Sequence, residues 1–276
     1  MSRDSSRPGD VFTHRTPRVV AARRLTTRSG RDDAGRFLAE GAQAVREALR
    51  FGRVHELFVT EAAARRHPDL VAGASSVSYI DRRAAELLSE TVTPQGIVAV
   101  CDTVDVPLAS ALRGTPRLVA VLAGVSDPGN AGTVLRVADA AGADAVVFAG
   151  DTVDVHNGKC VRASTGSLFH LPVARERDLD VVLDSCAAAG LRVVAADGSA
   201  THATDDLEST PVLAEPAAWL FGNEAHGLPS AVVARADHVV RVPLYGRAES
   251  LNLATAAAVC LYAAAMAARR RIADRG

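Results

Sequence analysis

Hydrophobic and polar positions alternate with two different periods along the chain, and each change of period marks the boundary of a predicted element. Short apolar runs such as residues 54–60 (VHELFVT) are typical of strands, whereas apolar positions three or four residues apart are typical of helices. The first part of the chain is predicted to contain strands at residues 37–41, 54–60, 77–80 and 97–101, and helices at residues 42–51, 62–72 and 82–89. The sequence therefore predicts a small α/β domain at residues 17–105, preceded by a polar, mobile tail at residues 1–16.

A second run of alternating strands and helices follows residues 106–116, whose prolines and glycine predict a linker. Residues 117–123 (RLVAVLA) are apolar except at their start, as expected for a strand that is buried on both faces of a parallel sheet. The second run is predicted to contain strands at residues 117–123, 145–148, 171–174, 191–196, 218–221 and 238–242, and helices at residues 130–142, 157–164, 179–189, 229–234 and 253–271. Residues 117–276 are therefore predicted to form an α/β domain in which helices cover both faces of a parallel sheet.

Basic residues are distributed unevenly. The formal net charge is −1, so an electrostatic site for nucleic acid must come from local clustering. Residues 1–36 contain nine arginines and four acidic residues, a local excess of five positive charges, and Arg23 and Arg24 are adjacent within this segment. Arginine can bind two phosphate oxygens at once, so the segment suits a phosphate backbone. A solvated basic segment explains the same cluster equally well, and GC-rich codon usage explains the excess of arginine over lysine.

Composition disfavours several classes of protein. No pair among the four cysteines has the spacing of metal ligands or of a redox motif, so the sequence predicts no metal site. The charged N-terminus lacks the apolar segment of a signal peptide, which predicts a cytoplasmic location. The most apolar run, residues 253–268, is alanine-rich and shorter than a membrane span, so it predicts a buried C-terminal helix and no membrane association.

Polar residues follow three predicted strands of the second domain, where ligands of open α/β sheets bind. The first turn carries Asn130, a suitable helix cap, and Arg136 follows it by about one and two-thirds helical turns. The second turn carries Gly222, which permits close approach of a ligand, and Glu224. The third turn, residues 242–253, carries Ser250 and Asn252. Each turn alone is also explained by helix capping.

A phosphate-binding cofactor is not supported. No G-x-G-x-x-G string and no P-loop follow the predicted strands. A nicotinamide-dependent oxidoreductase, which the α/β alternation alone would allow, therefore lacks its fingerprint.

Together the three turns resemble the three motifs of the SpoU/TrmH ribose methyltransferases of the SPOUT superfamily. The matching strings are N-x-G-x-x-x-R at residues 130–136, F-G-N-E-x-x-G-L at residues 221–228, and V-P-L…S-L-N-L at residues 242–253. Residues 162–168 and 37–41 are also similar to the family. The resemblance covers roughly residues 20–270.

The resemblance implies an α/β catalytic domain with a deep trefoil knot at its C-terminal end, a feature that no periodicity argument predicts. It also implies that the cofactor, S-adenosyl-L-methionine, lies bent in the knot. The resemblance also implies a homodimer, in which residues of both subunits complete each site at the subunit interface. The positions that match the family's cofactor-binding residues are Leu220, Gly222, Val242, Leu244 and Leu251.

The resemblance further implies an RNA substrate, because the family's small N-terminal domain is similar to a ribosomal protein and binds structured RNA. This layout favours 23S ribosomal RNA, and transfer RNA is the alternative substrate. Some relatives with this layout confer resistance to ribosome-targeting antibiotics, so a resistance role is a hypothesis for this chain. A non-catalytic RNA-binding protein of the same fold is the alternative from another functional class.

The implied reaction is an in-line attack of a ribose 2′-oxygen on the methyl group of a sulfonium cofactor, without a metal. Arg136 matches the family's candidate base, but a guanidinium has a pKa above about 12 and stays protonated. We therefore expect Arg136 to grip the phosphate beside the target ribose and to stabilise negative charge on the 2′-oxygen.

Other residues receive supporting roles from the same resemblance. The proton is expected to pass to Glu224, to a neighbouring phosphate or to water. Asn130, Ser250 and Asn252 are expected to orient Arg136 and the ribose. Arg162 is expected to be a further arginine that faces the RNA.

Overall fold

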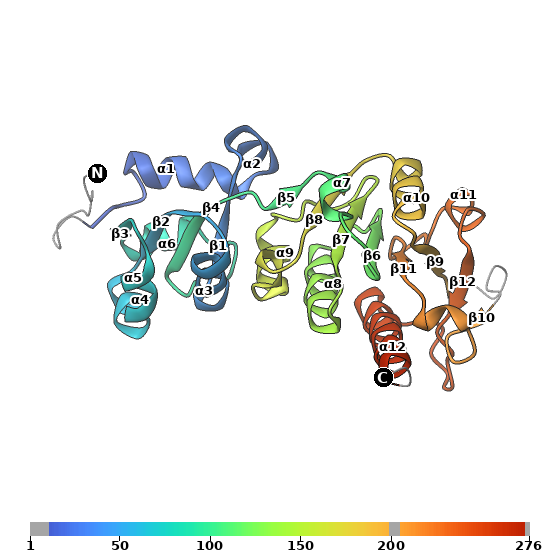
Figure 1. Cartoon of the computed structure of the whole chain (residues 1–276). Helices are drawn as coiled ribbons and strands as arrows, with labels where there is room; N and C mark the ends of the chain where they lie inside the picture. The colour runs from blue at the N-terminus through green and yellow to red at the C-terminus, as the bar shows by residue number, and fades with distance from the viewer. Residues whose placement is uncertain (1–10, 199–204, 274–276) are drawn as a thin grey trace. The chain divides into compact units, whose positions relative to one another are not determined.

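The computed structural model of the chain describes residues 11–198 and 205–273 (Figure 1). Contacts within these residues divide the chain into two units. Unit 1 contains residues 11–104 and 154–170, and unit 2 contains residues 105–153 and the described part of residues 171–276. Most of the predicted mobile tail, residues 1–10, lies outside the described residues.

A four-stranded sheet forms the centre of unit 1, in the order β1-β4-β2-β3. β4 is antiparallel to both of its neighbours, whereas β2 and β3 are parallel. The strands are β1 (Arg36–Glu40), β2 (Val54–Val59), β3 (Val77–Tyr79) and β4 (Ile97–Asp102). The helices are α1 (Pro17–Arg23), α2 (Arg28–Ala34), α3 (Ala42–Phe51), α4 (Glu61–Arg66), α5 (Pro68–Gly73), α6 (Arg82–Leu87) and α9 (Gly158–Ser164), with single 3₁₀ turns η1 (Arg24–Thr26) and η2 (Ser167–Phe169).

The alternation predicted for unit 1 is confirmed, with two corrections. One predicted helix, residues 62–72, is two helices, α4 and α5. The break falls before Pro68, because proline has no backbone N–H and its ring clashes with the preceding turn. Residues 11–16 are not a mobile tail, since the backbone N–H of Phe12 donates to the carbonyl of Tyr79 at 2.7 Å and the carbonyl of Phe12 accepts from Asp81 at 2.9 Å.

Unit 2 contains an eight-stranded sheet in the order β10-β12-β9-β11-β6-β7-β8-β5, and every neighbouring pair is parallel. The predicted parallel α/β sheet is thus confirmed. The strands are β5 (Asp105–Val106), β6 (Leu118–Ala123), β7 (Ala145–Ala149), β8 (Val173–Glu176), β9 (Arg192–Ala196), β10 (Asp205–Asp206), β11 (Ala217–Phe221) and β12 (His238–Arg241). The helices are α7 (Leu108–Ala111), α8 (Pro128–Ala141), α10 (Leu179–Ala188), α11 (Ser230–Val233) and α12 (Leu253–Ala273), with a 3₁₀ turn η3 (Pro211–Ala214).

The structure assigns two segments differently from the sequence prediction. The predicted linker, residues 106–116, is part of unit 2, because the side chains of Leu108 and Leu112 are buried in its hydrophobic core. Residues 154–170, predicted within the second domain, pack with unit 1 instead. A buried ion pair anchors them there: the Arg31 guanidinium lies 2.7 Å from the Asp154 carboxylate, and both side chains are 5% exposed.

The central strands of unit 2 are apolar along their whole length, which explains their position. All of the residues of β6, β7 and β11 are buried, as parallel strands covered by helices on both faces require. Helix α12 packs against α8 beside this sheet (Figure 1). No helix in the described ranges is both long enough and apolar enough to cross a membrane. The trefoil knot stays a prediction.

Candidate functional site

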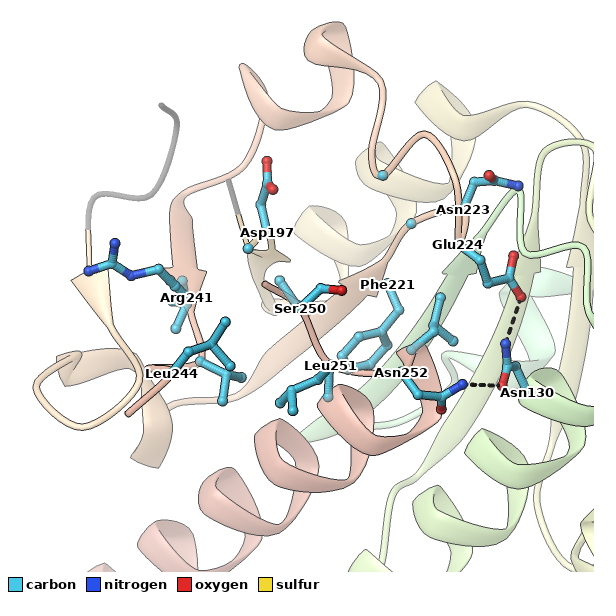
Figure 2. A pocket seen from close by; sticks show the side chains of 18 of the residues that line it. Asn130, Asp197, Phe221, Asn223, Glu224, Arg241, Leu244, Ser250, Leu251 and Asn252 are labelled. Carbon is cyan, nitrogen blue, oxygen red and sulfur yellow. Dashed lines mark hydrogen bonds between the residues drawn. The ribbon is translucent and has the colours of Figure 1, made fainter. Parts of the chain in front are cut away.

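The carboxyl ends of four neighbouring strands of unit 2 meet around a cavity of about 490 Å³ (Figure 2). In sheet order these strands are β12, β9, β11 and β6. The order of the strands along the chain reverses between β11 and β6, which is where α/β sheets bind ligands. The turns that follow the strands supply the walls, with the first turn of α12. The lining residues are Asn130, Ala196, Asp197, Gly198, Phe221, Gly222, Asn223, Glu224, Gly227, Val240, Arg241, Val242, Leu244, Glu249, Ser250, Leu251, Asn252, Leu253 and Ala256.

Hydrogen bonds to the Glu224 carboxylate connect the turn after β11 with the turn after β6. It accepts hydrogen bonds from the backbone N–H groups of Ser126 and Asp127, both at 3.1 Å. It also accepts from the Ser126 hydroxyl at 3.2 Å and from the Asn130 amide at 3.0 Å. Partial burial raises the pKa of Glu224, but these hydrogen bonds outweigh it, so the pKa lies below its ordinary value. A carboxylate held in this way is a weak proton acceptor.

The Asn130 side chain links Glu224 to the start of α12. Its Nδ2 donates to Glu224, and its Oδ1 accepts a hydrogen bond of 3.0 Å from Nδ2 of Asn252 (Figure 2). Oδ1 of Asn252 in turn accepts from the backbone N–H groups of Ala254 and Thr255 at 2.9 and 3.3 Å, as an N-cap does. The three turns singled out in the sequence are therefore joined by one chain of hydrogen bonds.

The cap of α8 is Asp127 and not Asn130, which is a correction to the expected role of Asn130. The Asp127 carboxylate accepts from the backbone N–H of Asn130 at 2.8 Å, so Asn130 lies within the first turn of the helix. Pro128 sets the first helical position two residues earlier than expected, because its fixed φ suits that position. The Asn130 side chain is thereby left to bind Glu224 and Asn252.

The backbone at Gly222 is packed closely against the opposite side of its own turn. A Cβ atom added at Gly222 would lie 2.4 Å from the carbonyl carbon of Gly227 and 2.5 Å from the backbone nitrogen of Leu228. The backbones of Asn223 and Gly227 are also joined by two hydrogen bonds, of 2.9 and 2.8 Å. Only glycine fits position 222 without opening this turn.

Four of the five residues expected to bind the cofactor line the cavity: Gly222, Val242, Leu244 and Leu251. Leu220 does not. Its side chain is fully buried in the hydrophobic core beneath the sheet, and the next residue, Phe221, lines the cavity in its place. Side chains of successive strand residues point to opposite faces, so Leu220 and Phe221 cannot share one side.

Arg136 lies on α8, with its side chain exposed, and is not among the residues that line the cavity. The Arg136 guanidinium makes no hydrogen bond or ion pair with any other described residue. Ser250, by contrast, lines the cavity from the turn that precedes α12. The structure thus brings Asn130, Glu224, Ser250 and Asn252 together and leaves Arg136 available to a group from outside the chain.

The three other arginines expected to face RNA belong to unit 1. Arg23 ends α1 and Arg24 begins η1, and both side chains are exposed. Arg162 on α9 is paired instead: its guanidinium lies 3.0 Å from the buried Glu40 carboxylate and 3.8 Å from the Glu90 carboxylate. This pairing neutralises part of the charge that was expected to face RNA.

Asp197 and Arg241 line the cavity but were not singled out in the sequence. Asp197 follows the last residue of β9, and its backbone N–H donates to the carbonyl of Val240 at 3.1 Å. Arg241 binds the Asp206 carboxylate through Nε and Nη2 at 2.9 and 2.7 Å. The sequence contained a signal for Asp197: the Asp197-Gly198 pair directly follows a predicted strand, so it forms a fourth turn at the same edge of the sheet.

S-adenosylmethionine fits the chemistry of this cavity. The volume lies within the range of small-molecule sites, roughly 300–1,000 Å³. The apolar side chains of Val242, Leu244 and Leu251 suit an adenine ring, and the carboxylates of Asp197 and Glu249 suit a cofactor with cationic sulfonium and ammonium groups. No group of three or more potential metal ligands occurs among the described residues.

Both units match known protein families. Residues 117–262 match the SpoU rRNA Methylase family, and residues 16–99 match the MRM3-like substrate binding domain. The first match covers the cavity and all three of its motif turns.

The most similar relatives include rRNA methyltransferases whose sequences match nearly the whole length of this chain. The 23S rRNA (guanosine(2553)-2′-O)-methyltransferase RlmP of Bacillus subtilis is 40% identical over 253 residues, which cover 91% of this chain and 97% of the relative. The crystal structure of an AdoMet-bound rRNA methyltransferase from Sinorhizobium meliloti is 31% identical, with a TM-score of 0.79 over 93% of this chain and 95% of that one. The SpoU methyltransferase AviRb from Streptomyces viridochromogenes, in complex with AdoMet, is 31% identical with a TM-score of 0.78 over 93% and 99% of the two chains.

Proposed function

The chain belongs to the SpoU rRNA methylase family, and we propose that it transfers a methyl group from S-adenosylmethionine to a ribose 2′-hydroxyl of 23S ribosomal RNA. One observation carries the proposal: Glu224, Asn130 and Asn252, from three separate turns, form a continuous hydrogen-bonded chain at a cavity that suits the cofactor. The relatives named for 2′-O-methylation of 23S rRNA, and those solved with AdoMet, support the same reaction.

The reaction forms a bond between a ribose 2′-oxygen and a methyl carbon, breaks the bond between that carbon and a sulfonium sulfur, and releases one proton and a neutral thioether. When bound, S-adenosylmethionine supplies a methyl group on a positively charged sulfur. The protein has to hold the 2′-oxygen in line with this group and to stabilise the negative charge that develops on the oxygen. Ser250 lies on the cavity wall, where its hydroxyl can orient the ribose.

Arg136 is proposed to bind the phosphate beside the target ribose. Its side chain is exposed on α8, close in sequence to Asn130 at the cavity wall. A guanidinium keeps its proton at physiological pH, so Arg136 supplies charge and geometry rather than proton removal. Its planar fork can bind two oxygens of one phosphate.

Glu224 is proposed to position Asn130 and the turn after β6, and not to accept the 2′-proton. Its two oxygens already accept four hydrogen bonds, and its pKa is lowered. The proton then passes to the neighbouring phosphate or to water. This assignment removes one of the three acceptors that the sequence allowed.

A homodimer is proposed as the active form. Helix α12 carries three exposed apolar side chains, Val259, Tyr262 and Met266, at 40%, 43% and 51% exposure. Their spacing of three and four residues places them on one face of the helix. An exposed apolar stripe of this kind suits an isologous contact with the same helix of a second copy.

Unit 1 is proposed to bind the ribosomal RNA, in the cytoplasm. It matches a substrate-binding domain, and exposed arginines such as Arg23 and Arg24 can contact phosphates. A transfer RNA substrate remains the second candidate, and a non-catalytic RNA-binding protein the third. The intact chain Glu224–Asn130–Asn252 favours catalysis over the third candidate.

The deciding experiment is methyl transfer from radiolabelled S-adenosylmethionine to purified 23S ribosomal RNA and, separately, to transfer RNA, followed by digestion to nucleosides. Label in a 2′-O-methylnucleoside from 23S RNA is expected. Label in a 2′-O-methylnucleoside from transfer RNA alone would support the proposed reaction but contradict the proposed 23S RNA substrate. Label on a base would overturn the ribose attack, and no label in naked RNA or in assembled ribosomal subunits would favour a binding protein.

A further inference from the structure

Unit 1 contains a cavity that no part of the reaction at the sheet edge of unit 2 uses. We propose that this cavity binds an unpaired nucleotide of the substrate RNA, with the base inside and the phosphate at Arg66. The inference rests on the proposed function, since it assumes that the substrate is RNA. It adds a defined subsite to a domain otherwise matched only by its general role in substrate binding.

The cavity lies at the carboxyl ends of β2 and β3, the two parallel strands of the unit 1 sheet. Its volume is about 980 Å³, twice that of the cofactor cavity and large enough for a nucleotide. Its walls are formed by α4, by α6 and by the turn before β4. The lining residues are Val11, Thr60, Glu61, Ala62, Arg65, Arg66, Tyr79, Ile80, Asp81, Arg82, Ala85, Glu86, Val92, Thr93, Pro94, Gln95 and Gly96.

Arg66 is the strongest candidate to bind a phosphate. Its Nε and Nη2 donate only to backbone carbonyl oxygens, those of Ala62 and Gln95, at 3.4 and 3.3 Å. No carboxylate of the described residues lies within ion-pair distance of it. The positive charge of Arg66 is therefore oriented by neutral acceptors but not neutralised by them, and a phosphate can pair with it.

Two further arginines at the cavity are held only by weak pairs. Arg65 pairs with Glu61 at 2.7 Å and Arg82 with Glu86 at 2.8 Å, each four residues apart on a helix. The side chains of Arg65 and Glu61 are 67% and 79% exposed, and those of Arg82 and Glu86 are 93% and 49% exposed. Exposed pairs of this kind contribute little, so they can rearrange around an RNA backbone.

The walls supply the contacts that a base requires. Tyr79 and Pro94 are half-buried in the cavity wall, and the buried side chains of Ile80 and Ala85 lie beside them in the lining. Val92 stands fully exposed beside them. An aromatic ring with apolar neighbours is a stacking platform for a base of any identity. The Thr93 hydroxyl and the Gln95 amide provide polar groups for its edge.

The concave shape favours an unpaired nucleotide over a duplex. The bases of an RNA duplex are stacked and paired, so their faces cannot reach Tyr79, whereas a base in a loop or bulge can turn outward. A duplex would contact only the arginines around the opening. Single-stranded RNA is therefore expected to bind more tightly than a duplex of the same sequence.

Binding of the full chain to a fluorescent twelve-nucleotide single-stranded RNA, with the matching duplex as competitor, tests the proposal. Arg66→Gln should weaken binding about tenfold and reduce the salt dependence of log Kd by about one. Arg83→Gln, an exposed arginine of α6 outside the cavity, is the matched control and should bind as the wild type does. A 4-thiouridine version of the RNA should crosslink to the peptide that contains Tyr79.

Three results would overturn the subsite: unchanged binding by Arg66→Gln, crosslinks only outside the cavity, or equal competition by the duplex. Methyl transfer and cofactor affinity, measured on the same proteins, separate this proposal from the proposed function. Weakened RNA binding by Arg66→Gln in a chain that methylates no RNA would retain the subsite and reject the methyltransferase. If the wild type methylates RNA and Arg66→Gln has the same KM for RNA, the methyltransferase is retained and the subsite is rejected.

Discussion

The side chains of Asn130 and Asn252 are 122 positions apart in the chain, yet Nδ2 of Asn252 donates a 3.0 Å hydrogen bond to Oδ1 of Asn130. Each amide has its second group fixed as well, since Asn130 donates to Glu224 and Asn252 caps α12. A rotation that exchanges the oxygen and nitrogen of the amide would break two hydrogen bonds of Asn130 and three of Asn252. The starts of α8 and α12 are therefore held in register with the turn after β11.

Replacing Asn252 separates its two roles. Asn252→Asp keeps an oxygen to cap α12 but loses the donor to Asn130, so the melting temperature should change little while turnover falls at least tenfold. Asn252→Ala loses both contacts and should also destabilise the fold by about 1 kcal/mol. Thermal melts and methylation rates of the two variants test this. Equal loss of melting temperature in both would show that the bond to Asn130 matters mainly for folding.

Glu224→Gln should reduce both cofactor affinity and turnover, because an amide nitrogen would replace one oxygen that now accepts from Ser126 or Asp127. The pKa of Glu224 is lower in the folded chain than its ordinary value of 4.5. Its ionised form therefore stabilises the fold fully above about pH 4.5, and this contribution is lost as the pH falls through the lower folded pKa. The difference in melting temperature between wild type and Glu224→Gln should accordingly shrink below pH 4.5. Full cofactor affinity with abolished turnover would instead support Glu224 as the base.

Arg136→Ala should lower turnover about 10²- to 10³-fold, the typical effect of removing one group that stabilises developing charge. The affinity for S-adenosylmethionine should change little, because Arg136 does not line the cofactor cavity. Isothermal titration with cofactor and single-turnover methylation measure the two quantities. Arg113→Ala, at another exposed arginine of unit 2, is the control and should leave both unchanged. A parallel loss of cofactor affinity in Arg136→Ala would indicate a structural role.

Gly222→Ala should abolish cofactor binding and lower the melting temperature. The added methyl group would lie 2.4 Å from the carbonyl carbon of Gly227, and a backbone atom cannot move aside as a flexible side chain can. The turn of residues 222–228 must open, and Glu224 lies within it. Gly73→Ala is the control, because its added methyl would meet only Cδ1 of Leu49 at 3.8 Å. Normal cofactor affinity in Gly222→Ala would show that the turn tolerates opening.

The elements of the site could be predicted from the sequence because they follow strands. Three polar turns after apolar strands were expected at one edge of a parallel sheet, and the structure places Asn130, Glu224 and Asn252 there within hydrogen-bond distance of one another. The turn that carries Asp197 was missed, although the same reasoning applies to it.

Other features depend on contacts that the pattern does not contain. Leu220 and Phe221 are both apolar and both buried, so alternation alone cannot tell which one faces the cavity. Residues 154–170 follow a strand of unit 2 but pack with unit 1, through the buried pair of Arg31 and Asp154. That pair joins positions 123 apart, a separation at which hydrophobic periodicity carries no information.

The homodimer yields the last prediction. Val259, Tyr262 and Met266 form an exposed apolar stripe on α12, the helix that begins at the cavity wall with Leu253 and Ala256. If the stripe is the subunit contact, Tyr262→Glu places a charge in an apolar interface without a partner, which is strongly unfavourable. We expect the wild type to sediment as a dimer and Tyr262→Glu as a monomer, with loss of methylation and with the fold retained. Val181→Glu, at another exposed apolar residue of unit 2, should remain dimeric and active. A wild-type monomer with full activity would overturn the dimer, and a dimeric Tyr262→Glu would move the contact away from this face of α12.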